Sequence, residues 1–374
     1  MSEHQQTAAA PPGAPGAAVG TASRRRPAAR RRPDRRMWTS AYLPIWPATA
    51  LLFAVSPLIA AGSLGGSALR GMVPFAAVLA IVGIGQTLVI QQRGLDLSVP
   101  GAVSLAAIIV TKYPAGHGGR LPAAIALALA ACAAAGLVSG FAVTWLRITP
   151  LVATLGVNAL LLGTILRITS GSSTATAAPG LADFTFGRAL EIPNTVLVAV
   201  AVLAAVAVVV RTTLLGRRFV AVGTNARAAY VAGLPVNRYR LLTYAAAGLC
   251  YGCAGILLAG YLRTPGLSAG DNYLLPSIAA VVLGGTSLAG GSGSVVATAG
   301  GALFLTQLQQ VVFGAGAPSS VQLLIQAGVI AAGMTLRAVP WRGVRRPRRT
   351  ASHPTGPAPP RPAGADHPEP TAPA

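Results

Sequence analysis

The sequence predicts an all-α membrane protein, a polytopic helix bundle with about ten transmembrane segments, one or two of them broken or re-entrant. Three observations lead to this prediction. Of the 374 residues, 53% are hydrophobic and only 10% are charged, and the mean hydropathy is +0.61, whereas a soluble domain has roughly 25% charged residues. The apolar residues gather in runs long enough to cross a bilayer. One of these runs ends in a stretch that is rich in glycine.

Ten apolar segments lie near the ~17–25 residues that a spanning helix needs. They are 45–62, 72–91, 97–112, 122–145, 151–169, 192–212, 241–261, 273–289, 294–312 and 320–337. The segments 97–112 and 273–289 are the ones expected to be broken or re-entrant. Together the ten define a transmembrane domain at 41–340. The flanking segments 1–40 and 341–374 are rich in Ala, Pro and Arg, with too few large apolar side chains to offset the entropy of ordering, and we expect them to be disordered.

The positive charge predicts an orientation in the membrane. The net charge is +21, and arginines cluster just before the first apolar segment and just after the last one. Such clusters mark the cytoplasmic side and contact anionic lipid; nucleic acid is not expected, because no basic folded domain accompanies them. An even number of spans places both termini in the cytoplasm of a bacterium, with the protein in its plasma membrane. The inner connections then carry Arg93, Arg147, Arg217, Arg218, Arg227, Arg238 and Arg240.

The glycine-rich run, residues 278–293, reads IAAVVLGGTSLAGGSG. Unsatisfied backbone groups cost several kcal/mol each in hydrocarbon, so such a segment is tolerated only where it is buried in protein or lines an aqueous path. Interrupted spans of this kind point to a transport site. We therefore place Gly284, Gly285 and Thr286 among the candidate pathway residues.

The loop 213–240 contains a short helix signal. Asn225 is a good N-cap, residues 226–232 are mostly helix formers, and Gly233 followed by Leu234-Pro235 is a stop. This pattern predicts a short helix on the cytoplasmic face between two spans. The alternative is an ordinary positively charged connection with one turn of helix.

Polar side chains inside or beside the spans are further candidates. Asp96 is an acid in apolar surroundings, which suggests function, but it also precedes a helix that it could cap, together with Ser98. Gln86, Asn158 and Gln307 suit recognition of hydroxyl groups, and their alternative role is hydrogen bonding between helices. Each alternative stays open at this point.

Catalytic chemistry is largely missing from the sequence. The only lysine, Lys112, is followed by Tyr113, so no phosphate loop of the G-x-x-x-x-G-K-[ST] type exists. The histidines form no ligand cluster, so no metal site is expected. Cys250 and Cys253 form a C-x-x-C inside a span, where buried cysteine usually acts as a small apolar residue rather than a redox centre. We expect no catalytic residues and no enzyme activity.

Four runs, in order, resemble the permease subunits of ribose-type ATP-binding cassette (ABC) sugar importers. They are GIGQTLVIQQRGLDLSVPGAVSL at 83–105, ITPLVATLG at 148–156, the loop 216–240, and the glycine-rich run. The chain departs from the family pattern at three places: Arg93 stands where the first glycine of a GGIDLSVG motif would be, Pro100 where the last would be, and Leu274 where an acidic residue is usual.

The resemblance implies a dimeric half-channel with a separate ABC ATPase inside and a solute-binding protein outside. The expected solute is a monosaccharide or similar polar molecule, and ATP is used by the partner, so this chain needs no cofactor. The segment marked by Asn225, Ala228, Ala229 and Gly233 would be the helix that couples to the ATPase. Alternatives are an ABC permease for a nucleoside, signalling molecule or amino acid, a channel or secondary carrier, and a polytopic enzyme or scaffold.

Overall fold

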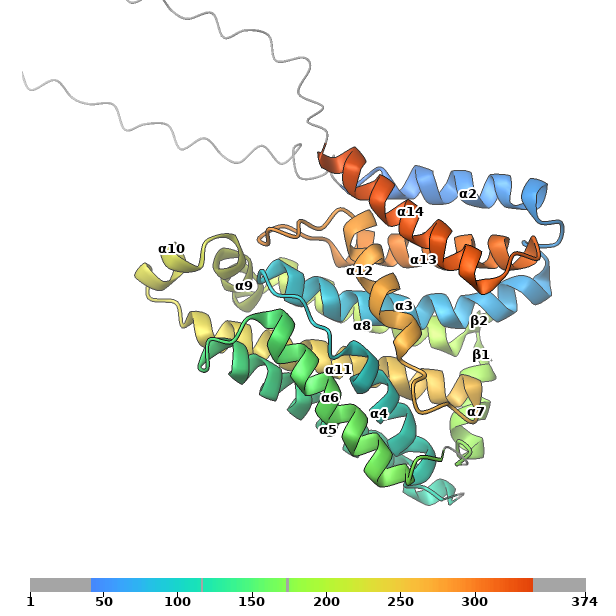
Figure 1. The fold of residues 1–374 in the computed structure, drawn as a ribbon, viewed down its shortest axis with the longest axis horizontal. Helices are drawn as coiled ribbons and strands as arrows, with labels where there is room; N and C mark the ends of the chain where they lie inside the picture. Colours follow the sequence, from blue (N-terminus) through green and yellow to red (C-terminus); the bar gives the residue numbers. More distant parts are fainter. Residues whose placement is uncertain (1–41, 116, 173–174, 339–374) are drawn as a thin grey trace, which may run out of the picture.

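The computed structural model describes residues 42–115, 117–172 and 175–338, and shows a bundle of helices (Figure 1). The predicted arms 1–40 and 341–374 lie outside the described residues. Within these residues, six helices are long and apolar enough to span a membrane: α3 (Gly66–Gln91), α5 (Leu121–Thr144, extended by the 3₁₀ turn η1 at Gly118–Arg120), α6 (Pro150–Thr169), α8 (Asn194–Thr212), α11 (Val236–Leu262) and α13 (Val295–Gly314). The all-α bundle predicted from the sequence is confirmed.

The remaining predicted segments are helical as well. They are α2 (Ile45–Ile59), α4 (Val99–Lys112), α12 (Leu274–Leu283, preceded by the 3₁₀ turn η2 at Asp271–Tyr273) and α14 (Ser319–Ala338). At 14 and 10 residues, α4 and α12 are too short to cross ~30 Å of hydrocarbon at 1.5 Å per residue. Interrupted helices at these two places are therefore confirmed.

The core of the bundle surrounds α11, which packs against α3, α4 and α5. Residues 99–111 of α4 are all buried, so this short helix lies inside the protein. Glycines allow the closest approach: a Cβ atom at Gly248 on α11 would overlap the Cys132 backbone of α5, and one at Gly136 on α5 would overlap the Tyr244 backbone of α11. Small residues at such crossings let the helix backbones touch.

Three elements were missed by the sequence analysis. The helix α7 (Pro179–Phe186) and a two-stranded antiparallel hairpin, β1 (Arg188–Ala189) with β2 (Ile192–Pro193), lie between α6 and α8. The helix α9 (Leu214–Thr224) follows α8 and precedes a shorter helix, α10 (Ala226–Val231). All are too short to produce the long apolar runs from which the spans were predicted.

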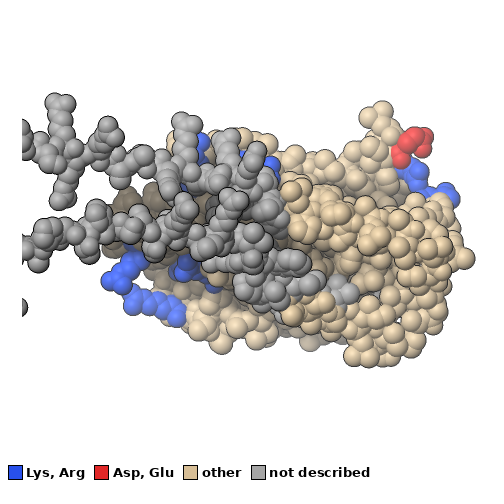
Figure 2. Space-filling model, turned by 90° about the horizontal axis from the view of Figure 1, so that it is seen from above, with Lys and Arg blue, Asp and Glu red and all other residues tan. Residues whose placement is uncertain are grey.

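Charged side chains gather at the two ends of the bundle (Figure 2). The arginine-rich end carries Arg93, Arg147, Arg211, Arg217, Arg218, Arg227, Arg238 and Arg240. The mixed-charge end carries Arg70, Lys112, Arg120, Arg167, Arg188 and Arg263 together with Asp183, Glu191 and Asp271. This separation is the one that the charge pattern predicts. Which end faces the cytoplasm stays a prediction.

Candidate functional site

The helix α10 begins and ends where the sequence predicts. The Ala228 backbone N–H donates to Oδ1 of Asn225 at 3.0 Å, which is an N-cap bond. At the other end Gly233 has φ +79°, and two backbone bonds close the helix, from Leu234 N to Ala229 O (3.0 Å) and from Gly233 N to Tyr230 O (2.9 Å). These are the two bonds of a Schellman cap. The short helix is thus held at both ends by its own sequence.

The two faces of α10 differ. Ala229 is 4% exposed and packs with Val222 and Val236, so it attaches the helix to the rest of the protein. The exposed face of α10 consists of Arg227, Ala228, Tyr230 and Val231, of which Tyr230 is 73% and Val231 is 81% exposed. The sequence analysis did not single out the last two. The available signal was a pair of large apolar side chains beside an arginine in a loop between spans.

The glycine loop, residues 284–294, lies beside α9 at the arginine-rich end. Its glycines 285, 290 and 291 have φ of +94°, +83° and +78°, a region that side chains with a Cβ rarely adopt. The Gly291 N–H donates to Gln91 O at the end of α3 (2.9 Å). A Cβ at Gly291 would lie 2.8 Å from Thr224 Cα, and one at Gly284 would lie 2.6 Å from Thr298 N. The loop therefore packs between the ends of α3 and α9 and the start of α13.

A second connection joins α3 to α9. The Gln92 side chain donates from Nε2 to Phe219 O at 2.8 Å. A Cβ at Gly223 would overlap the Gln91 carbonyl, so the two helix ends are in direct contact. We call this region, formed by residues 91–93, 219–225 and 284–294, the junction.

Buried polar side chains lie deeper in the bundle, among α3, α4 and α11. Asp96 Oδ1 accepts hydrogen bonds from the Ser98 backbone N (2.9 Å) and Oγ (2.6 Å), just before α4. The Tyr251 hydroxyl donates to Gln86 Oε1 at 3.0 Å, and Tyr251 also neighbours Asp96. All four side chains are at most 2% exposed. These bonds show Asp96 in the local turn that starts α4, while a contact with solute stays a prediction.

Two other candidate amides connect helices. Asn158 Oδ1 on α6 accepts from the Gly101 N–H at the start of α4 (2.8 Å), and Gln307 Nε2 on α13 donates to Ser56 Oγ on α2 (2.8 Å). The structure thus brings Gln86, Asp96 and Ser98 together, with Asn158 of α6 bonded to the first turn of α4. It places Gln307 and the Gly284–Thr286 segment elsewhere. The eight candidate pathway residues do not form one cluster in a single chain.

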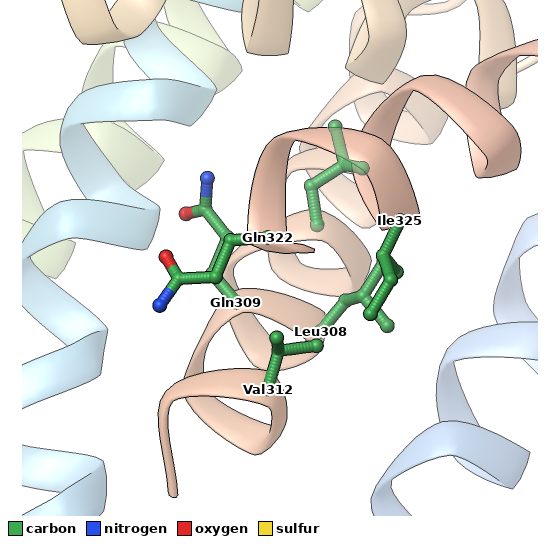
Figure 3. A pocket seen from close by; sticks show the side chains of 6 residues that line it. Leu308, Gln309, Val312, Gln322 and Ile325 are labelled. Carbon is green, nitrogen blue, oxygen red and sulfur yellow. The ribbon is translucent and has the colours of Figure 1, made fainter. Parts of the chain in front are cut away.

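Other sites can be assessed within the described ranges. No group of His, Cys, Asp or Glu there could hold a metal ion. A small pocket between α13 and α14 is lined by Leu305, Leu308, Gln309, Val312, Gln322 and Ile325. In Figure 3 the amides of Gln309 and Gln322 lie beside each other at its edge. None of the candidate residues predicted from the sequence lines it.

Comparison with known proteins decides the family. The model of the family described as "Branched-chain amino acid transport system / permease component" matches residues 68–334. The chain belongs to this family. The match begins within the first turn of α3 and includes every helix from α4 to α13, the junction and the buried polar side chains described above. The resemblance to transport permeases drawn from the four sequence runs is confirmed, and the chain is a multi-pass membrane protein of a bacterial type.

Three relatives illustrate the range of the family. The permease is 38% identical to the ribose import permease protein of Escherichia coli (strain K12) over 258 residues, which are 68% of this chain and 80% of the relative. It is 36% identical to the galactofuranose transporter permease protein of the same strain, over 68% of this chain and 75% of the relative. It is 31% identical to an autoinducer 2 import system permease protein of Escherichia coli O9:H4, over 70% and 81%. No solved structure was found to match the chain.

Proposed function

We propose that this permease is the membrane-spanning subunit of an ABC importer, in which two copies form the path for a monosaccharide or similar polar solute. A separate ATPase drives the transport, and ATP is used there and not in this chain. The proposal is supported by the family match and by relatives whose names include ribose import and galactofuranose transport. The single structural observation that carries it is the direct packing of the glycine loop on the segment that leads into α10.

The geometry supports a route for mechanical coupling. The exposed face of α10 is the surface that the ATPase would contact, because it presents an aromatic, an aliphatic and a basic side chain to the outside. The other face is attached to the junction. The two short helices meet the same junction, since α12 ends at the glycine loop and α4 follows the segment 92–98. A displacement of α10 would therefore reach both interrupted helices and open or close the path.

The arrangement of partners follows from the two ends of the bundle. The arginine-rich end, with the loop 213–240 and both termini, would face the cytoplasm and the ATPase. An extracytoplasmic solute-binding protein would dock at the mixed-charge end, where α7 and the β1–β2 hairpin lie outside the spans. The basic arms would touch anionic lipid of the bacterial plasma membrane.

One alternative solute is favoured by an observation. The relatives include import permeases for autoinducer 2 as well as for sugars. A signalling molecule is therefore the second candidate, on the same fold and with the same coupling.

Reconstitution tests the proposal. The permease is placed in vesicles with an ABC ATPase and a solute-binding protein of the same organism, and uptake of radiolabelled ribose, galactofuranose and autoinducer 2 is measured with and without ATP. We expect uptake of one of them only when all three proteins and ATP are present, and no ATP hydrolysis by the permease alone. Robust hydrolysis by the pure chain, or uptake that ignores ATP, would contradict the proposal.

A further inference from the structure

The side chain of Arg93 spans the gap between the end of α3 and the end of α9. Its Nη2 donates to Thr224 O at 2.6 Å and its Nε donates to Gly223 O at 3.2 Å. These are the last two carbonyls of α9, and the next residue is Asn225, the N-cap of α10. Carbonyls at a helix C-terminus lack partners in their own helix and carry partial negative charge. A guanidinium, with several donors in one plane, fits them well.

The backbone of Arg93 is unusual. Its φ is +64°, in the left-handed region that favours glycine. The GGIDLSVG motif that this segment resembles has glycine at the same position. An arginine there loses conformational freedom that glycine would keep, so the strained conformation is retained because the surrounding contacts enforce it. Outliers of this kind concentrate at functional positions.

The absence of a side chain at Gly290 leaves room for the Arg93 side chain. Gly290 of the glycine loop lies against Arg93 Cγ so closely that a Cβ there would overlap it. Across the described part of the chain, no acidic side chain forms an ion pair with this guanidinium. The charge is therefore directed at the end of α9 alone, although the residue is exposed.

Beyond Arg93 the chain leads directly to α4. The Gly94 N–H donates to Val89 O (3.1 Å), Leu97 N donates to Thr154 Oγ1 (2.9 Å), and Asp96 holds Ser98 as described. The segment 94–98 is thus held by hydrogen bonds to α3 and α6 and by the turn in which Asp96 accepts from Ser98. One end of this segment is fixed through Arg93 to the end of α9, directly before α10, and the other end leads into α4.

We propose that Arg93 is the positioning residue that transmits displacement of α10 to the buried helix α4. This inference rests on the proposed function, because it assumes an ATPase acting on α10. It assigns a role to a residue at which this chain departs from the motif it resembles. Arg93 contacts neither solute nor ATP in this role and acts only through α9 and α10.

Substitution of Arg93 tests the inference, with Arg147 as the matched control. Arg147 is also an arginine at positive φ (+55°) at the arginine-rich end, it is exposed, and its side chain has no hydrogen bond within the described residues. The variants Arg93→Ala, Arg93→Gly and Arg93→Lys are compared with Arg147→Ala and Arg147→Gly. Each is reconstituted with the ATPase and the solute-binding protein. Three quantities are measured: ATPase association by pull-down, basal ATP hydrolysis, and solute transported per ATP.

We expect Arg93→Ala and Arg93→Gly to insert, bind the ATPase and hydrolyse ATP at the basal rate, and to lose on the order of fivefold or more in solute transported per ATP. Arg93→Lys keeps one point charge without the planar fork and should fall between them and the parent. The Arg147 variants should match the parent. Equal transport per ATP in Arg93→Ala and the parent would overturn the inference, and so would a loss of ATPase association parallel to the loss of transport.

Hydrogen exchange supplies a readout that a purely structural role would not change. In the parent complex, ATP should alter amide exchange in residues 94–98. In Arg93→Ala and Arg93→Gly this response should vanish, in Arg93→Lys it should be reduced, and in the Arg147 variants it should persist. A response that survives in Arg93→Lys and Arg93→Ala alike would contradict the inference. If the proposed function itself were wrong, the parent protein would neither bind the ATPase nor respond to ATP. That outcome is distinct from a failure of the Arg93 inference, in which the parent responds and the Arg93 variants respond equally.

Discussion

The Tyr251 hydroxyl on α11 donates a hydrogen bond to the Gln86 amide oxygen on α3, and both side chains are completely buried. The Tyr251 ring also lies against Gly85, where a Cβ would come within 2.7 Å of the ring atom Cε1. One side chain thus fixes both the spacing and the register of two central helices. A hydrogen bond between helices in this setting contributes about 0.6 kcal/mol on average.

Removing the Tyr251 hydroxyl should destabilise the bundle modestly. Tyr251→Phe leaves the Gln86 oxygen without its donor, which costs about 1–3 kcal/mol for a buried group. Gln86→Leu should cost a similar amount, and the double variant less than the sum, because the second change no longer breaks a bond. Unfolding in detergent measures all three. Tyr261→Phe is the control, since that hydroxyl reaches Gly71 O only at 3.4 Å. Strict additivity of the two single changes would show that the bond contributes nothing.

Local features of the fold could be predicted from the sequence, because their causes lie within a few residues. The ends of α10 depend on Asn225 and Gly233, whose capping preferences are properties of the residues themselves. The spans depend on runs of apolar residues, and the interruption after α12 depends on the Gly284-Gly285 pair. Each of these signals can be recognised in the local sequence without knowledge of the tertiary contacts.

The junction could not be predicted in the same way, because it joins residues far apart in the chain. Gln91 accepts a hydrogen bond from Gly291, and Arg93 donates one to Thr224. The local sequence around each of these residues gives no signal of which distant residue it contacts. For the same reason the packing of the glycine loop beside α9 could not be predicted, and its place in the pathway stays a prediction. The inward direction of Ala229 also depends on Val222 and Val236, which lie on neighbouring elements.

The orientation can be tested by labelling single cysteines. In a background lacking Cys132, Cys250 and Cys253, a membrane-impermeant maleimide added to intact cells should label Glu191→Cys and should not label Arg227→Cys. Both residues are exposed, so access depends only on the side of the membrane. Arg227→Cys should react once the cells are permeabilised, which controls for reactivity. Labelling of Arg227→Cys in intact cells would reverse the topology and remove the coupling assignment of α10.

Glycine substitutions should separate backbone strain from packing at the junction. Gly291 and Gly316 have similar φ, +78° and +75°, but a Cβ at Gly316 meets nothing within 4 Å, whereas one at Gly291 meets Thr224. Both changes to alanine carry a strain of roughly 1 kcal/mol. Only Gly291→Ala should also displace α9 and impair transport, with insertion preserved.

Substitution by leucine should show the same contrast between a closely packed glycine and one beside open space. Gly284→Leu should impair transport strongly, because its Cβ alone would collide with the α13 backbone. Gly163→Leu on α6, where the Cβ would meet nothing within 4 Å, should be tolerated. Solute uptake, normalised to the amount of permease in the membrane, measures both effects. Normal transport by both Gly284→Leu and Gly291→Ala would mean that the junction does not couple to the path.

The exposed face of α10 should control binding of the ATPase. Val231→Glu places a charge on the most exposed apolar side chain of this face, and a charge buried without a partner in a protein contact costs about 3–5 kcal/mol. We expect the variant to insert normally and to lose ATPase association in pull-down by at least roughly a hundredfold, by the relation of about 1.4 kcal/mol per tenfold change. Tyr230→Ala should weaken association less, because it removes contact area without adding a charge.

Two controls make this last test specific. Leu190→Glu introduces the same charge at a side chain that is 92% exposed, but at the mixed-charge end, and should leave ATPase association intact. Ala229→Glu acts on the inner face and should disrupt the packing with Val222 and Val236, so it should loosen α10 itself and raise amide exchange in residues 226–231. Val231→Glu should leave that exchange unchanged. If Val231→Glu bound the ATPase and transported at the parental rate, α10 would be an ordinary connection between α9 and α11.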